Sequence, residues 1–241
     1  MSFPYTFSTK YNVQQHNVEY PLFNRLDKNL NIKSNHWLFN NFIKVDSINP
    51  ILNPSNQLKF IDPITETEVN WEARNVLNPT AVVKDNKVYL LYRAQDEMGT
   101  SRIGMAISDD GLHFKKMPSP VLYPKNDSMQ SYEWHYKKIN NEFSHSEPCE
   151  SCYFDGVEDP RIIESESGDY IMTYTAYDGK TARLSIATSK DLVNWTKHGL
   201  IFKEEKYINM WSKSGAIIGE LKGNKIVAKK IQGKYWMYFG D

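Results

Sequence analysis

An internal repeat with a spacing of about 81 residues constrains the fold of this chain more than any other feature of its sequence. The dipeptide Asn78-Pro79 returns as Asp159-Pro160, and apolar and turn-forming segments return with it. Three further relations define the copies: Val88–Tyr92 with Tyr170–Tyr174, Ser108–Phe114 with Ser189–Trp195, and a partial third copy at Lys234–Tyr238, in which Tyr238 is the counterpart of Tyr174. A unit of this length that recurs within one chain predicts a repeat architecture.

Each copy has the pattern of short strands. From residue 78 onward, short apolar runs alternate with turn-forming residues, and no stretch keeps the 3.6-residue apolar period of a helix. Recurring four-stranded units are typical of β-propeller blades, which stack around a channel because one blade cannot bury both of its faces. We therefore predict an all-β fold of the β-propeller type.

The repeat also divides the chain. Residues 1–60 are polar, rich in Asn and without periodicity, so we expect an irregular N-terminal arm packed on the propeller. Residues 61–241 form the predicted propeller domain, with an insertion at about residues 125–155 that lengthens the first copy. Because the third copy stops within a hairpin, we expect the chain to be truncated within the later blades.

Charge and cysteine content exclude several classes of protein. The 29 basic and 29 acidic side chains give no net charge, so we expect neither nucleic acid nor membrane as a partner. No apolar run approaches the ~20 residues of a membrane-spanning helix and no signal-peptide pattern begins the chain, so we expect a cytoplasmic protein. Two cysteines, Cys149 and Cys152, exclude a disulfide framework. With His145 and His135 nearby they form a weak pattern for zinc, so we expect unpaired thiols and no metal.

The repeat places polar residues at equivalent strand starts. Asn78 and Asp159 share one position directly before a proline, where we expect the side chains of successive blades to converge on a channel mouth. Glu158 and Asp159 are adjacent on a strand, so only one of them is expected to face the pocket, and the other to pair with Arg161. An Asp-Pro pair is also a common turn element, so a purely structural role stays open.

Three more polar residues lie at strand ends. Arg93 and Asp96 follow a strand, where an arginine can bind sugar hydroxyls or form a salt bridge at the rim. Lys213 precedes a strand and offers a cation beside small residues. Aromatic side chains make up 13% of the chain and suit sugar rings as well as sheet packing. Since the Gly-x-Ser-x-Gly elbow of serine hydrolases is absent, the paired carboxylates and the arginine favour glycoside chemistry.

Taken together, these segments resemble glycoside hydrolase family 130, the mannoside phosphorylases and mannosidases. The resemblance covers about residues 75 to 241 in family order, through four segments: Asn78–Val83, Tyr92–Asp96, Gly156–Arg161 and Trp211–Ala216. It implies a five-bladed β-propeller and an inverting mechanism on β-mannosides, without a metal or an organic cofactor. It also implies that Asp159 is the catalytic acid and that Asn78 and Arg93 contact the sugar in the −1 subsite.

One departure from the family pattern bears on the reaction. Phosphorylase members carry a His-Arg-Pro segment after the strand that corresponds to Lys234–Tyr238, and its arginine helps to bind phosphate. Here the segment is Phe239–Asp241, and residues 223–230 contain no arginine. Because lysine replaces a bidentate arginine poorly at a phosphate, we expect an inverting β-mannosidase that uses water, acting on β-1,2-linked mannooligosaccharides. Its general base is Asp241 or a residue beyond it.

Three alternatives stay open: a β-mannoside phosphorylase that releases mannose 1-phosphate, an arabinanase-like glycosidase, and a non-catalytic propeller that binds glycans or proteins. A homo-oligomer is also open, and the aromatic residues of the insertion are expected to cover the pocket or to meet a neighbouring subunit. Around the catalytic Asp159, the expected substrate-binding residues are Asn78, Arg93, Asp96, Glu158, Arg161, Lys213 and Asp241.

Overall fold

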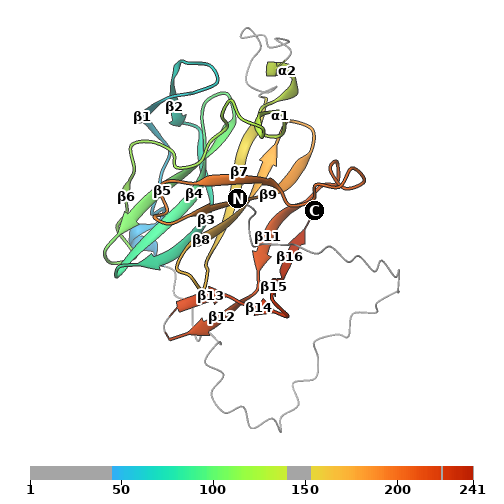
Figure 1. Cartoon of the computed structure of the whole chain (residues 1–241). Coiled ribbons are helices and arrows are strands. Elements are labelled where there is room, and N and C mark those ends of the chain that lie inside the picture. The colour runs from blue at the N-terminus through green and yellow to red at the C-terminus, as the bar shows by residue number, and fades with distance from the viewer. Residues whose placement is uncertain (1–44, 140–152, 224, 241) are drawn as a thin grey trace, which may run out of the picture.

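The computed structural model describes residues 45–139, 153–223 and 225–240, and this part of the chain is mostly β-structure (Figure 1). Its helices are single turns: a 3₁₀ turn at Asp46–Ile48, α1 at Gln130–Glu133 and α2 at Tyr136–Ile139. No helix of these residues is long and apolar enough to span a membrane. The prediction of a β fold is confirmed at this level.

Two four-stranded antiparallel units follow one another along the chain, as the repeat predicts. Each unit pairs its strands in sequence order, and Figure 1 shows the first unit in cyan and green beside the second in yellow and orange. The strands are β3 (Asn75–Lys84), β4 (Lys87–Gln95), β5 (Thr100–Ser108) and β6 (Lys115–Lys116), then β7 (Asp155–Glu164), β8 (Tyr170–Tyr177), β9 (Ala182–Ser189) and β10 (Thr196–Leu200).

The third copy is partial. Its two paired strands, β11 (Lys213–Ile217) and β16 (Met237–Gly240), correspond to the first hairpin of the other units. Between them lie two small hairpins: β12 (Gly219–Lys222) with β13 (Lys225–Ala228), and β14 (Lys230–Ile231) with β15 (Lys234–Tyr235). Within the described residues the sheets do not close into a ring, so the five-bladed propeller stays a prediction.

The register of the third copy differs by one residue from the sequence alignment. Arg161 pairs with Thr173 in the second unit, and Ala216 at the equivalent position pairs with Tyr238 in the third. Tyr238 is therefore the counterpart of Thr173, and the prediction that it corresponds to Tyr174 was wrong. The apolar run around Tyr238 offers similar side chains at successive positions, so its pattern alone could not fix the register.

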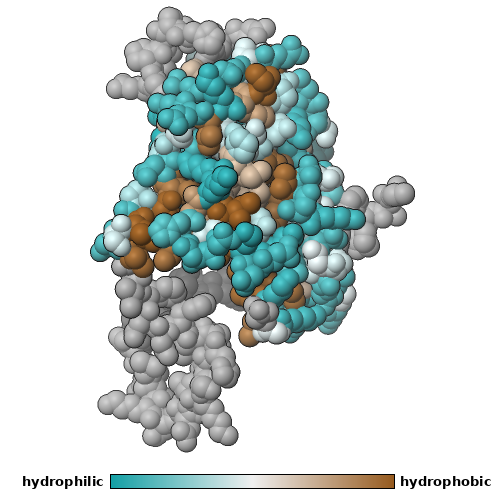
Figure 2. Space-filling view, turned by 90° about the vertical axis from the view of Figure 1, so that its left-hand side faces the viewer, coloured by the Kyte–Doolittle hydropathy of each residue, from teal (hydrophilic) through white to brown (hydrophobic). Residues whose placement is uncertain are grey.

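The end of the predicted N-terminal arm contains a strand. β1 (Ser55–Ile61) pairs with β2 (Glu68–Glu72), and this hairpin packs on the first unit through Trp71, which is fully buried. Residues 45–54 of the arm are also described and include the 3₁₀ turn at Asp46–Ile48, whereas residues 1–44 lie outside the described residues. On the side of the molecule where β1, β2 and β6 lie, the surface is largely hydrophilic with small apolar patches (Figure 2). Small patches of this kind are ordinary for a folded domain.

The same turn closes the third strand of each unit, which explains the repeated Ser-x-Asp segment. Ser108 Oγ accepts the backbone N–H of Gly111, and Ser189 Oγ accepts that of Leu192 at the equivalent place. Asp110 and Asp191 each accept two further backbone N–H groups with Oδ1. The serine and aspartate are thus repeated because they satisfy the backbone of a tight turn.

A buried Tyr–Glu–Lys cluster also occurs once in each unit. Tyr174 Oη donates to Glu133 Oε1 at 2.8 Å, and Lys197 pairs with the second oxygen of the same carboxylate. In the first unit the members are Tyr92, Glu72 and Lys116. Burial raises the pKa of Glu133 to about 7, although Lys197 opposes this shift. These clusters connect the second and fourth strand of a unit through a carboxylate from outside it.

A third repeated device, an Asp–Arg pair, holds the turn between the second and third strands. Asp96 Oδ2 pairs with Arg102 Nη1 at 2.7 Å, and Asp178 Oδ2 pairs with Arg183 Nη1 at the same distance. The second amino group differs: in Arg102 it pairs with buried Asp62 at 2.5 Å, whereas in Arg183 it donates to an amide oxygen of Asn209. Arg102 thus neutralises two buried carboxylates and Arg183 only one.

This difference predicts unequal costs for two matched substitutions. Arg102→Leu should lower the free energy of unfolding by about 3–5 kcal/mol, because it leaves the carboxylates of Asp62 and Asp96 buried without a cation. Arg183→Leu should cost about half as much, since one carboxylate and a neutral amide lose their partner. Urea denaturation of both variants measures the difference, and equal losses would contradict this account.

Candidate active site

The first strands of the three copies, β3, β7 and β11, are called the inner strands here. Each of them contains one residue with a left-handed backbone at the same repeat position. The φ angle is 44° at Asn78, 51° at Asp159 and 55° at Ser214. At each of them the pairing with the next strand shifts register, as in a β-bulge. Asn and Asp adopt this conformation more readily than most residues that have a Cβ. The recurrence of Asn78 and Asp159 in the sequence is therefore a recurrence of backbone geometry.

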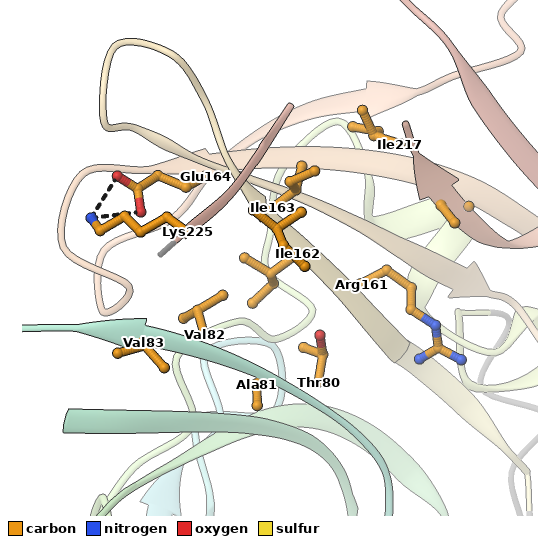
Figure 3. A pocket seen from close by; sticks show the side chains of 13 residues that line it. Thr80, Ala81, Val82, Val83, Arg161, Ile162, Ile163, Glu164, Ile217 and Lys225 are labelled. Atoms are coloured by element: carbon orange, nitrogen blue, oxygen red, sulfur yellow. Dashed lines mark hydrogen bonds and ion pairs between the residues drawn. The ribbon is translucent and has the colours of Figure 1, made fainter. Parts of the chain in front are cut away.

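Beyond these bulges the inner strands converge on an apolar hollow of about 400 Å³ (Figure 3). β3, β7 and β11 contribute residues such as Val82, Ile162 and Ile217, and β13 contributes Lys225. Lys225 is paired with Glu164 at 3.0 Å at one edge. The convergence brings the three bulges, and the side chains on them, into one region of the molecule.

Asp159 is held through one of its two carboxyl oxygens. Asn78 Nδ2 donates to Asp159 Oδ1 at 2.7 Å, and Arg93 Nη1 lies 3.6 Å from the same oxygen. Oδ2 has no hydrogen-bond partner among the residues that the structure describes, and the side chain keeps 16% of its surface exposed. The carboxyl group is therefore oriented by Oδ1 and offers Oδ2 to the site.

Glu158 faces the same arginine. Arg93 Nη2 lies 2.7 Å from Glu158 Oε1, and Ser101 Oγ donates to that oxygen at 3.0 Å. Arg93 Nε in turn donates to Ser101 Oγ at 3.1 Å. Gln95 Nε2 also donates to this hydroxyl, at 3.2 Å. The fully buried Ser101 thus fixes the arginine and the glutamate relative to each other.

The prediction that one of the adjacent carboxylates pairs with Arg161 was wrong. Both Glu158 and Asp159 lie against Arg93. The bulge at Asp159 interrupts the alternation of side chains along the strand, which the prediction took to be regular. Arg161 Nη1 instead donates to the carbonyl oxygen of Pro160 at 3.0 Å.

Burial changes the acidity of Glu158. Removal from water raises its pKa to about 7; the cation of Arg93 opposes this shift and the negative charge of Asp159 adds to it. Only 7% of the Glu158 residue is exposed. Burial therefore keeps a proton on Glu158 in part of the molecules near neutral pH.

The structure gives less direct evidence about three other predicted binding residues, Asp96, Lys213 and Asp241. Asp96 accepts the N–H groups of Met98 and Thr100 with Oδ1 and pairs with Arg102 through Oδ2, so the turn uses both of its oxygens. Lys213 Nζ lies 5.9 Å from the ring centre of Trp211. Asp241, the predicted base, lies outside the described residues. A role in sugar binding stays a prediction for each of these three residues.

Sequence reasoning missed Ser101 and Ser214. The repeat itself could have found Ser214, because it stands in Trp211–Ala216 where the other copies have Asn78 and Asp159. No signal of this kind marks Ser101, whose role depends on the side chains that β4 and β7 bring to it.

The insertion at residues 125–155 is described only in part. Trp134 is buried and the ring of His135 stacks on that of Tyr136 at 4.7 Å, while Tyr153 meets His135 edge-on at 4.9 Å. The rings of His135, Tyr136 and Tyr153 thus pack on one another. Cys149 and Cys152 lie outside the described residues, and within the described part no group of His, Cys, Asp or Glu could hold a metal ion.

A buried ion pair between Lys138 and Asp155 holds the start of β7. Lys138 Nζ lies 2.8 Å from Asp155 Oδ2 and donates to Thr100 Oγ1 at 2.7 Å. His135 donates its backbone N–H to the same Asp155 oxygen at 2.7 Å. The insertion thus fixes the start of β7, the strand that carries Glu158 and Asp159.

Comparisons of sequence and of overall fold find known proteins that are similar to this chain. The "1,2-beta-oligomannan phosphorylase" of Thermoanaerobacter sp. (strain X514) is 27% identical over 73% of this chain and 53% of its own length. A glycosyl hydrolase from Bacteroides ovatus has a TM-score of 0.73 and 38% identity, over 86% of this chain and 56% of its own.

A further solved structure carries the description "The GH130 family of mannoside phosphorylases contains glycoside hydrolases that target beta-1,2 mannosidic linkages in Candida mannan". It has a TM-score of 0.73 and 41% identity, over 85% of this chain and 54% of its own. The chain spans about half the length of the curated relatives it matches.

The sequence model of one family matches most of the chain. This model, glycoside hydrolase family 130, is described as β-1,4-mannooligosaccharide phosphorylase and matches residues 46–241. The match includes all three bulges and the carboxylates that lie around Arg93. On this match the chain belongs to glycoside hydrolase family 130.

Proposed function

We propose that this chain carries the acid half of a catalytic site that cleaves β-mannosides with inversion, in a propeller of five blades. One observation carries the proposal: Asp159 is oriented through Oδ1 by Asn78 and Arg93, and its Oδ2 is left without a described partner. A general acid needs a carboxyl group that is fixed in direction and free to reach the glycosidic oxygen. Asp159 meets both conditions.

The protonation of the neighbouring Glu158 affects how much of the positive charge of Arg93 is available to Asp159. Near neutral pH Glu158 keeps its proton in a large fraction of molecules, so Arg93 is then not fully neutralised by it. The positive charge of Arg93 also faces Asp159, at 3.6 Å. When Asp159 transfers its proton to the leaving oxygen, its new negative charge develops beside this cation, which stabilises the transition state.

Water is the proposed nucleophile, and β-1,2-mannosides are the proposed substrates. Two observations support this choice. Residues 223–230 contain lysines and no arginine. The solved structure whose description names glycoside hydrolases that target β-1,2 mannosidic linkages is 41% identical to this chain, whereas the two curated phosphorylases are 27% and 28% identical. Asp241 is the candidate that the sequence offers for the general base, and it lies outside the described residues.

A phosphorylase is the second candidate, favoured by the descriptions of the family and of the curated relatives. Water and phosphate differ in the product that they leave. With phosphate as the nucleophile, mannose 1-phosphate forms and the reaction stops when phosphate is removed. With water as the nucleophile, free mannose forms, and it forms at the same rate when phosphate is absent.

The first prediction concerns Asp159. Asp159→Asn should lower kcat on β-1,2-mannobiose roughly 10³-fold, because an amide cannot give a proton to the leaving oxygen while it keeps the contacts of Oδ1. Chromatographic product analysis measures the loss. Asp109→Asn is the matched control, since the Asp109 side chain is 83% exposed on another turn. An Asp159→Asn variant as active as the wild type would exclude this residue as the acid.

The second prediction concerns the nucleophile. The wild-type protein should release free mannose from β-1,2-mannobiose equally well in phosphate-free buffer and with added phosphate. Product analysis in the two buffers, with a phosphorylase of known activity as the positive control, measures this. Mannose 1-phosphate that appears only with phosphate would replace hydrolysis by phosphorolysis and leave the role of Asp159 intact.

The third prediction follows from the raised pKa of Glu158. Its pKa is about 7 in the folded protein and near the ordinary value of 4.5 in the unfolded chain. The folded state therefore holds the proton more tightly, and this contribution to stability is complete below about pH 4.5 and is lost as the pH rises through 7. Glu158→Gln should flatten the pH dependence of Tm between pH 5 and 7.5. An unaltered slope in this variant would contradict the assignment.

A further inference from the structure

We propose that Trp211 and Tyr177 form a stacking platform for the sugar on the leaving-group side of the scissile bond. The proposal rests on the function proposed above, because it takes Asp159 as the proton donor to the glycosidic oxygen. It goes further in assigning residues and a physical contact to the second sugar of the substrate, a β-linked mannosyl unit.

Trp211 is largely exposed, and its described contacts give it no role in holding the fold together. It lies two residues before the start of β11 and keeps 46% of its surface exposed. Trp71, Trp195 and Trp236 each donate their indole N–H to a backbone carbonyl. Trp211 donates to none of the residues that the structure describes. An indole ring and a free N–H at the surface offer a flat apolar face together with a hydrogen-bond donor.

The neighbours of Trp211 connect it to the carboxylate site. The ring of Tyr177 lies 6.2 Å from that of Trp211, at an angle of 58°. Tyr177 ends β8 opposite Gly156, two residues before Glu158 on the paired strand. Burial raises the pKa of Tyr177, and the negative charge of Glu158 raises it further, which agrees with a phenol close to this carboxylate. The aromatic pair therefore begins at the site.

The two sides of Asp159 have opposite character. On one side, β3 and β4 supply the polar side chains of Asn78 and Arg93, which hold the carboxyl group. On the other side, β11 packs against β7 and β8, and the aromatic ring of Trp211 lies two residues before its start. A disaccharide with its glycosidic oxygen at Asp159 would therefore have one ring among polar groups and the other against an aromatic face.

A mannosyl ring fits this surface chemically. Pyranose rings carry C–H groups on their faces and hydroxyl groups at their edges, so one face packs on an indole while the edges reach polar neighbours. Lys213, whose Nζ lies 5.9 Å from the Trp211 ring centre, is positioned to donate to such hydroxyl groups. The apolar hollow beyond the bulges lacks this combination, since its lining is largely aliphatic.

Substitution of Trp211 tests the platform by a ratio of two substrates. β-Mannosyl fluoride has no second sugar, whereas β-1,2-mannobiose does. Trp211→Ala should lower the ratio of kcat/KM for mannobiose to kcat/KM for the fluoride by about tenfold, the loss expected for one aromatic contact. Trp211→Phe, which keeps a flat ring, should restore most of it. Trp236→Ala is the matched control, because Trp236 is 50% exposed at the far end of the β11–β16 pair.

The outcomes separate this proposal from the proposed function. A ratio that stays at the wild-type value in Trp211→Ala, or that falls equally in Trp236→Ala, would overturn the platform and leave the role of Asp159 standing. If the wild-type protein cleaves neither substrate, the proposed function fails. Titration of mannobiose against the same variants by calorimetry then decides, and weaker binding in Trp211→Ala alone would still support the platform.

Discussion

The left-handed residue in each inner strand is the constraint on which the candidate site depends. A non-glycine residue in this conformation costs on the order of 1–2 kcal/mol, and the chain accepts it at Asn78, Asp159 and Ser214 alike. The ladders on both sides of each bulge hold it in place, because pairing resumes within two or three residues. Without the bulge, Glu158 and Asp159 would point to opposite faces of β7. With it, both reach Arg93.

A single cation, that of Arg93, then lies between two carboxylates that differ in burial. Arg93 is closer to Glu158, at 2.7 Å, than to Asp159, at 3.6 Å, and Ser101 strengthens the first of these contacts. Even so, Glu158 is so buried that its pKa rises to about 7. Desolvation therefore outweighs the ion pair at this position. The less buried Asp159 keeps an oxygen that faces the site, and this division between an inner and an outer carboxyl group gives each a different part in the chemistry.

The sequence allowed the two complete units to be predicted, because their signals are local. The Ser-x-Asp turn depends on side chains that bind backbone N–H groups within four residues, so a repeat in sequence is a repeat in structure. The buried Tyr–Glu–Lys clusters could not be predicted in this way. Glu72 and Glu133 come from unrelated segments that share no spacing with the repeat, and only the packing of the hairpin β1–β2 and of α1 brings them to their tyrosines.

The same limit explains what was predicted and missed at the site. Asn78, Asp159 and Arg93 lie in segments that the repeat or the family resemblance marks, whereas Ser101 is defined only by its distance to three other side chains. The three bulges also indicate how repeated units acquire one asymmetric site. The backbone at this position is the same in each copy, and the side chain is an amide, a carboxylic acid and a hydroxyl in turn. Because the acid accepts a hydrogen bond from the amide of the preceding copy, each copy contributes chemistry that it could not perform alone.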